Sequence, residues 1–193
     1  MNDLWVAFWR SLEGFLRGLA ATPAGADLGA KTAVVEIGST GYSREAEEDG
    51  IRAQIVAFAR AQVGDAYRYG AEHGLKEADP KDWDCSELTE NAYRRAGKHL
   101  PDGAAAQKAY CRARRVRDPR PADLFFLGPN LEGIPHVGLY AGEGQAIEAR
   151  SKRVGGKQTG AVQYTARALV EAHPRFQGWY RHPDLAWPQE ERA

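Results

Sequence analysis

This chain of 193 residues has few cysteines, and its cysteine and histidine spacings match no zinc-binding pattern. The two cysteines, Cys85 and Cys111, are too few for the disulfide framework of a small secreted domain. A bridge between them is compatible with the sequence, but it would silence the nucleophile considered below. We expect neither a metal ion nor another cofactor.

The chain also lacks an excess of charge of either sign. Lys+Arg and Asp+Glu number 26 each, so no global field draws the chain toward nucleic acid or an anionic membrane, and we expect no nucleic-acid partner. Arginines are concentrated between Arg112 and Arg120, which we interpret as a solvated face rather than a binding patch. No apolar run approaches the ~20 residues of a membrane span, which argues against stable membrane insertion.

The N-terminal region is predicted to differ from the rest of the chain. Residues 3–20 carry apolar side chains at the helical period and predict an amphipathic helix, followed by a linker rich in Ala, Gly and Pro. Three roles are open for this helix: packing on the main domain, docking a protein partner, or lying at a membrane interface. Its Lys-poor polar face disfavours the membrane. Arg10, Glu13 and Arg17 interrupt its apolar stretch, so it is no convincing secretory signal. We therefore expect synthesis in the cytoplasm, with separate delivery to any outside target.

Helical patterns come first in the remainder and strand patterns follow, which predicts an α+β fold with an antiparallel sheet. Residues 38–50 are interpreted as loop or as the approach to the next helix. The predicted helices are 48–63, 84–96, a short one through Gln107 and Cys111, and 165–172; the predicted strands are 31–38, 122–127, 136–141, 145–150, 160–164 and 177–181. We divide the chain into an N-terminal helix with its linker (1–50), a main domain (51–183) and a tail (184–193).

The strands at 136–141 and 145–150 permit a stricter prediction. If Gly142-Glu143-Gly144 is a three-residue hairpin loop, Ala141 faces Gln145. A two-residue loop would expose apolar side chains of the second strand, so the three-residue register is favoured. In that register the apolar residues of both strands share one face: Val137, Leu139, Ile147 and Ala149.

The same register places His136 and Glu148 together on the other face. They are diagonal neighbours across Gly138, at a distance of roughly 7 Å that long side chains can span. Glu148 can then accept a hydrogen bond from one imidazole nitrogen while the other faces Cys85, which begins a predicted helix. A thiol is a strong nucleophile as thiolate, a state favoured by a helix N-terminus and a nearby imidazolium. This is the nucleophile–base–orienter arrangement of cysteine hydrolases; the alternatives are a buried structural cysteine and a structural histidine.

Several ordered motifs carry a resemblance to a known family. Asp84-Cys85-Ser86, with Tyr67 before it and the segment 136–144 after it, resembles the NlpC/P60 family of cell-wall cysteine peptidases. Residues 64–70 are similar to that family's G-x-P-Y-x-x-G stretch, and residues 121–126 to its P-G-D-L-x-F strand. The resemblance covers about residues 51–182. It implies a papain-like α+β fold, with N-terminal helices packed on a central antiparallel sheet, and hydrolysis of amide bonds in peptidoglycan stem peptides, commonly after γ-D-glutamate.

The resemblance also implies roles for individual residues. Cys85 would be the nucleophile, His136 the base and Glu148 the orienting residue. The remaining positions would line the site: Tyr67 near the oxyanion, with Asp84 and Ser86 holding the free amine of the substrate.

Three residues depart from the family pattern. Glu87 replaces the glycine of D-C-S-G, and Ala122 replaces the glycine of P-G-D-L. Glu148 stands where His, Asn or Gln is more usual; a carboxylate favours the imidazolium more strongly and shifts the pH profile.

The leading prediction is therefore a peptidoglycan cysteine endopeptidase, most similar to members from phages and phage-tail-like particles. It would act at the cell wall as a phage lysin, a tail-associated enzyme or a bacterial effector, delivered by a phage particle, a holin or a secretion system. Glu87 and Glu148 motivate an alternative, a non-catalytic domain that binds the wall or a partner. A third reading is another papain-like reaction, such as transpeptidation, amidase or deamidase chemistry.

Overall fold

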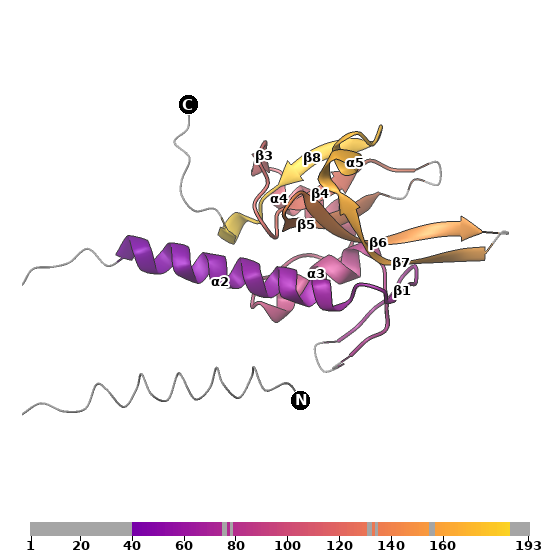
Figure 1. The fold of residues 1–193 in the computed structure, drawn as a ribbon, viewed down its shortest axis with the longest axis horizontal. Coiled ribbons are helices and arrows are strands. Elements are labelled where there is room, and N and C mark those ends of the chain that lie inside the picture. The colour runs from indigo at the N-terminus through magenta and orange to yellow at the C-terminus, as the bar shows by residue number, and fades with distance from the viewer. Residues whose placement is uncertain are drawn as a thin grey trace, which may run out of the picture. The chain divides into compact units, whose positions relative to one another are not determined.

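The computed structural model describes residues 40–74, 77, 79–130, 133, 135–154 and 157–185, which belong to one compact unit, Gly38–Ala193. The helix predicted at 3–20, the strand predicted at 31–38 and residues 186–193 of the predicted tail lie outside these residues. Helices and strands combine in an α+β fold (Figure 1). The helical elements are α2 (Thr40–Ala61), α3 (Cys85–Arg95), α4 (Ala104–Cys111), α5 (Arg167–Glu171) and the 3-10 turn η1 (Pro183–Leu185).

The strands of this part of the chain form one eight-stranded sheet in the order β2-β1-β7-β6-β5-β4-β8-β3. Every neighbouring pair is antiparallel except β1 and β2, which run parallel. Their bounds are β1 Ala66–Tyr67, β2 Asp82–Trp83, β3 Arg115–Val116, β4 Leu124–Leu127, β5 His136–Gly142, β6 Gln145–Val154, β7 Lys157–Ala166 and β8 Phe176–Tyr180. The short strands β2 and β3 were not predicted from the sequence.

Helix α2 begins at Thr40, so the loop expected before residue 48 is wrong, and the predicted domain boundary at residue 50 lies inside this helix. Residues 44–48, Arg-Glu-Ala-Glu-Glu, all have high helix propensity. One reason for the helix's fixed position is Arg52, which is 2% exposed and forms ion pairs with Glu48 (2.8 Å) and Asp123 (3.0 Å). Arg181 pairs with the same Asp123 at 2.9 Å, so buried charges join α2 to the turn before β4.

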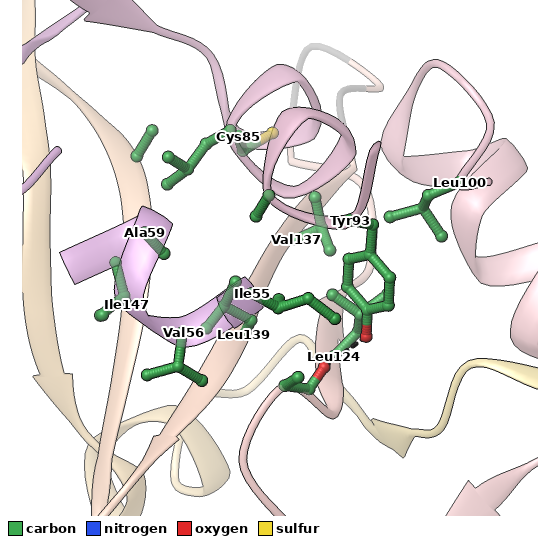
Figure 2. Close-up of a cluster of buried hydrophobic side chains, with 14 of the residues drawn as sticks. Ile55, Val56, Ala59, Cys85, Tyr93, Leu100, Leu124, Val137, Leu139 and Ile147 are labelled. Carbon is green, nitrogen blue, oxygen red and sulfur yellow. Dashed lines mark hydrogen bonds between the residues drawn. The ribbon is translucent and has the colours of Figure 1, made fainter. Parts of the chain in front are cut away.

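Alternation along the central strands produces two apolar faces. One face packs against α2 and α3. The core between them contains Ile55 of α2 and Leu88 of α3, together with Leu124, Val137, Leu139 and Ile147 of the strands. Figure 2 shows part of this cluster. The other face carries a smaller cluster that includes Phe125, Leu127, Tyr140, Ala146, Val170 and Trp179. The predicted assignment of apolar residues to one face of the β5–β6 hairpin is therefore confirmed.

The register of the β5–β6 hairpin is confirmed in part. Leu139 pairs with Ile147 as predicted, but Gly142 rather than Ala141 faces Gln145, because a bulge shifts the register between Tyr140 and Gly142. Glu143 (φ 52°) and Gly144 (φ 70°) then form a two-residue turn in the left-handed region. Such turns match the twist of the flanking strands, so the bulge combines a favourable turn with the apolar pairing.

The turn before β4 explains one departure from the family pattern. The N–H of Asp123 donates to the carbonyl of Arg120 at 2.9 Å, and Ala122 between them has φ 72°. This is a type II turn, whose third residue favours glycine because a Cβ is strained there. The chain thus keeps the glycine conformation at residue 122 without the glycine.

Candidate active site

Cys85 is the first residue of α3, where the predicted helix start is confirmed. Asp84 is the N-cap, and its Oδ1 accepts a hydrogen bond from the Glu87 N–H at 2.8 Å. Figure 2 shows Cys85 on the helix at the edge of the buried cluster, and Cys85 is 7% exposed. Cys85 and Cys111 are both free, so no bridge forms between them. Cys111 is fully buried, and this burial raises its pKa to about 12, which makes it an inert thiol.

His136 begins β5 and contacts Glu148 of β6, as the register predicts. Its Nε2 lies 2.6 Å from Glu148 Oε2, and the carboxylate is 1% exposed. The second carboxylate oxygen, Oε1, accepts a hydrogen bond from Thr165 Oγ1 at 2.5 Å and lies 3.4 Å from Arg150 Nη1. Both oxygens of Glu148 are therefore held by side chains of this sheet.

The electrostatics of this group favour an ion pair. Burial by itself lowers the pKa of His136, but hydrogen bonds to Cys85 and Glu148 outweigh it and raise this pKa to about 9. Burial raises the pKa of Glu148, yet its contacts with His136 and Thr165 bring it down to about 2. Since Nε2 of His136 is taken by Glu148, Nδ1 is the nitrogen left for the Cys85 thiol. The three side chains thus form a continuous set of contacts from thiol to imidazole to carboxylate.

Cys85 and His136 border a cleft of about 480 Å³. Glu148 lies behind His136 and does not line it; the other predicted site residues all do, namely Tyr67, Asp84, Cys85, Ser86 and His136. The cleft is open to a substrate that reaches Cys85 and His136 together.

In this cleft, Tyr67 has a shifted pKa, and Asp84 and Ser86 are held by hydrogen bonds. Burial, with the neighbouring Cys85 and Asp84, raises the pKa of Tyr67 well above its usual value, so its hydroxyl stays a hydrogen-bond donor. Ser86 Oγ donates to Asp84 Oδ1 at 3.0 Å, and the Gly70 N–H donates to Asp84 Oδ2 at 3.2 Å. Asp84 thus joins the helix start to the loop that follows Tyr67, and its role in binding an amine stays a prediction.

Glu87, unusual for the family, has a structural contact that the sequence did not reveal. It is 5% exposed, and its Oε1 accepts hydrogen bonds from the His73 N–H at 2.6 Å and from Asn91 Nδ2 at 2.7 Å. Burial raises the pKa of Glu87. This carboxyl thus ties α3 to the loop that borders the cleft. Both unusual glutamates, Glu87 and Glu148, therefore have defined contacts at or behind the cleft.

Sequence reasoning also missed two supports of the site. Gln107 is fully buried; its Nε2 donates to the Ser86 carbonyl at 2.9 Å, and its Oε1 accepts from Thr89 Oγ1 at 2.8 Å. Thr165 was assigned to a helix, but it lies in β7, next to its last residue, and pairs with Ala146 of β6. Extending the predicted strand at 160–164 by one residue would have placed Thr165 on the same sheet face as Glu148.

Among the described residues, no group of three or more His, Cys, Asp or Glu side chains could hold a metal ion. None of the helices in this part of the chain is long and apolar enough to cross a bilayer.

Comparison with known proteins identifies the family. Residues 64–173, more than half of the chain, match the model of the NlpC/P60 family. The "Probable endopeptidase p60" of Listeria monocytogenes is 35% identical over 100 residues, 52% of this chain and 19% of that protein. The "Gamma-DL-glutamyl hydrolase" of Bacillus subtilis is 31% identical over 103 residues, 52% of this chain and 24% of that protein. This chain therefore aligns with about a quarter or less of the length of these curated relatives.

Solved structures share the fold. The peptidoglycan hydrolase RipB from Mycobacterium tuberculosis superposes with a TM-score of 0.53 at 25% identity, covering 86% of this chain and 76% of that one. NlpC2 from Trichomonas vaginalis gives a TM-score of 0.52 at 22% identity, over 68% of this chain and 47% of that one. The α+β architecture predicted from the sequence is thereby confirmed, and the chain belongs to the NlpC/P60 family.

Proposed function

We propose that this protein is a cysteine peptidase that hydrolyses amide bonds in peptidoglycan stem peptides, at the bond after γ-D-glutamate. The observation that carries the proposal is the contact chain from Cys85 through His136 to Glu148, bordering an open cleft. The names of the relatives, a probable p60 endopeptidase, a γ-DL-glutamyl hydrolase and a peptidoglycan hydrolase, support the substrate class.

The geometry suits acyl transfer through a thioester. Cys85 Sγ attacks the carbonyl carbon as thiolate, the form that a helix N-terminus and the imidazolium favour. The negative charge that develops on the carbonyl oxygen meets the first N–H groups of α3, which lack intrahelical partners, and the Tyr67 hydroxyl. His136 gives its proton to the leaving amine as the C–N bond breaks. Water then donates a proton to His136, attacks the thioester and releases the acid and the thiolate.

Glu148 keeps His136 in place through this cycle. Its carboxylate fixes the ring orientation and stabilises the imidazolium, which gives its proton to the leaving amine and forms again when the ring takes a proton from water. Thr165 and Arg150 in turn hold the carboxylate. The site of action in this proposal is the cell wall, reached through a phage particle, a holin or a secretion system. We further propose that the segment 3–20 docks a protein partner there.

Digestion of muropeptides of defined composition, followed by mass spectrometry, tests the proposal. Wild type should yield fragments that have gained one water at the γ-D-glutamyl bond, and Cys85→Ala should yield none. Cys111→Ala is the matched control because it removes the other, buried thiol and leaves the cleft residues unchanged. Normal cleavage by Cys85→Ala would refute the role of Cys85, and products joined to an added amine would indicate transfer instead of hydrolysis.

A further inference from the structure

Two arginines line the cleft from its sheet side. Arg150 lies in β6 and Arg175 directly precedes β8, and both border the cleft with His136. Besides burial, the positive charges of Arg175 and Arg150 lower the pKa of His173, and His136 acts in the same direction. Both guanidinium groups therefore lie near one imidazole, close to the His136 end of the site.

Arg175 has no carboxylate partner among the described residues, and Arg150 has one longer contact, with Glu148. Arg175 donates from Nη1 to the Gly128 carbonyl at 2.8 Å, and it forms no ion pair with a carboxylate of the described residues. Arg150 has a 3.4 Å contact with Glu148, whose Oε1 already accepts a shorter bond from Thr165, and the Arg150 side chain is 45% exposed. A guanidinium offers five N–H donors, so most donors of Arg175 remain available to a ligand.

The acidic residues of the cleft come from a different part of the fold. Glu72 and Asp84 precede α3, and Asp102 precedes α4. The cleft therefore combines carboxylates from the helical side with guanidinium groups from the sheet side, and Cys85 and His136 come from these same two sides. A ligand that suits this distribution carries a cation at one end and an anion at the other. The planar fork of arginine matches a carboxylate in particular.

We propose that Arg175, assisted by Arg150, binds a free carboxylate of the substrate next to the scissile bond. This inference rests on the proposed function. A γ-linked glutamyl residue is attacked at its side-chain carbonyl and therefore keeps its α-carboxylate free. Amidation of that group, which gives isoglutamine, removes the negative charge and half of the acceptors. The cleft thus selects stem peptides with free glutamate over the amidated form.

Two synthetic peptides that differ only at this group test the inference: L-Ala-γ-D-Glu-L-Lys and L-Ala-γ-D-isoGln-L-Lys. A hydrogen bond to a charged group is worth enough for wild type to favour the acid by about 10- to 100-fold in kcat/KM. Arg175→Gln should bring the ratio close to one, mainly by slowing cleavage of the acid, and Arg175→Lys should give an intermediate ratio. Arg112→Gln, at an exposed arginine outside the cleft, should keep the wild-type ratio.

Calorimetry measures the affinity of both peptides for the Cys85→Ala variant, which separates recognition from catalysis. Tighter binding of the acid, lost when Arg175→Gln is added, supports the inference even if no peptide is cleaved. In that case the proposed hydrolysis fails and the carboxylate site stands. Equal cleavage and equal binding of acid and amide would overturn the carboxylate site while leaving the peptidase intact. A preference that survives Arg175→Gln would overturn the assignment to Arg175.

Discussion

The two sides of the cleft are built in different ways. On the helical side, Asp84, Cys85 and Ser86 are adjacent in the sequence, and their contacts close within the first turn of α3. On the sheet side, His136, Glu148 and Thr165 belong to three strands and meet only through strand register. In the proposed mechanism the helical side presents the nucleophile, whereas the sheet side sets the charge and orientation of the base. Substitutions on the two sides should therefore differ in what they change.

The largest effect is expected from removing the charge of the sheet side. Glu148→Gln keeps a hydrogen-bond acceptor for His136 Nε2 but no longer stabilises an imidazolium. We expect kcat for peptide cleavage to fall about a hundredfold or more, with little change in KM, because the carboxylate does not line the cleft. Steady-state kinetics on a muropeptide checks this, with circular dichroism to verify folding. Full activity of Glu148→Gln would show that the base needs no orienting charge.

The ion pair of His136 with Glu148 also makes the stability of the fold depend on pH. The pKa of His136 is raised from 6.5 to about 9, so its contribution is complete below pH 6.5 and is lost as pH rises through 9. The pKa of Glu148 is lowered from 4.5 to about 2, so its contribution is complete above pH 4.5 and is lost as pH falls through 2. The difference in unfolding free energy between wild type and Glu148→Gln should be largest between pH 4.5 and 6.5. Urea titrations across pH measure it, and a difference that does not vary with pH contradicts the ion pair.

Two buried threonines permit a direct comparison of how the helical side and the sheet side of the cleft affect stability and kcat. Thr165 donates to Glu148 at 2.5 Å on the sheet side, and Thr89 donates to Gln107 at 2.8 Å on the helical side. Both Thr→Val changes remove one buried hydrogen bond and should cost about 1–3 kcal/mol of stability. Only Thr165→Val should also lower kcat, by roughly tenfold, and shift its pH profile, since it loosens the orienting carboxylate. Thr165→Ser should restore the profile; an equal loss of kcat in Thr89→Val would remove the distinction.

The same difference explains what could be predicted from the sequence. The start of α3 at Cys85 follows from the capping aspartate next to it, which is a local pattern. The contact of His136 with Glu148 followed from the alternation of apolar residues in two adjacent strands. Thr165 was missed because the predicted strand ended at residue 164, whereas β7 continues to Ala166. The start of α2 was predicted too late because the polar residues before 48 were interpreted as loop, although the glutamates among them favour a helix.

The smallest effect is expected where the chain departs from its family in the turn before β4. Ala122 has φ 72°, a conformation that glycine adopts without the strain a Cβ causes. Ala122→Gly should relieve that strain, but it also removes a buried methyl group and makes the unfolded chain more flexible. The strain is worth about 1–2 kcal/mol and the two opposing costs together nearly as much, so we expect a change within about 1 kcal/mol. Thermal unfolding measures it. Because glycine adopts the same turn conformation, the pairing of β4 with β5 that supports His136 should be preserved and kcat should stay unchanged. A loss of activity at constant stability would mean that the sheet side of the cleft depends on this turn more closely than its register contacts indicate.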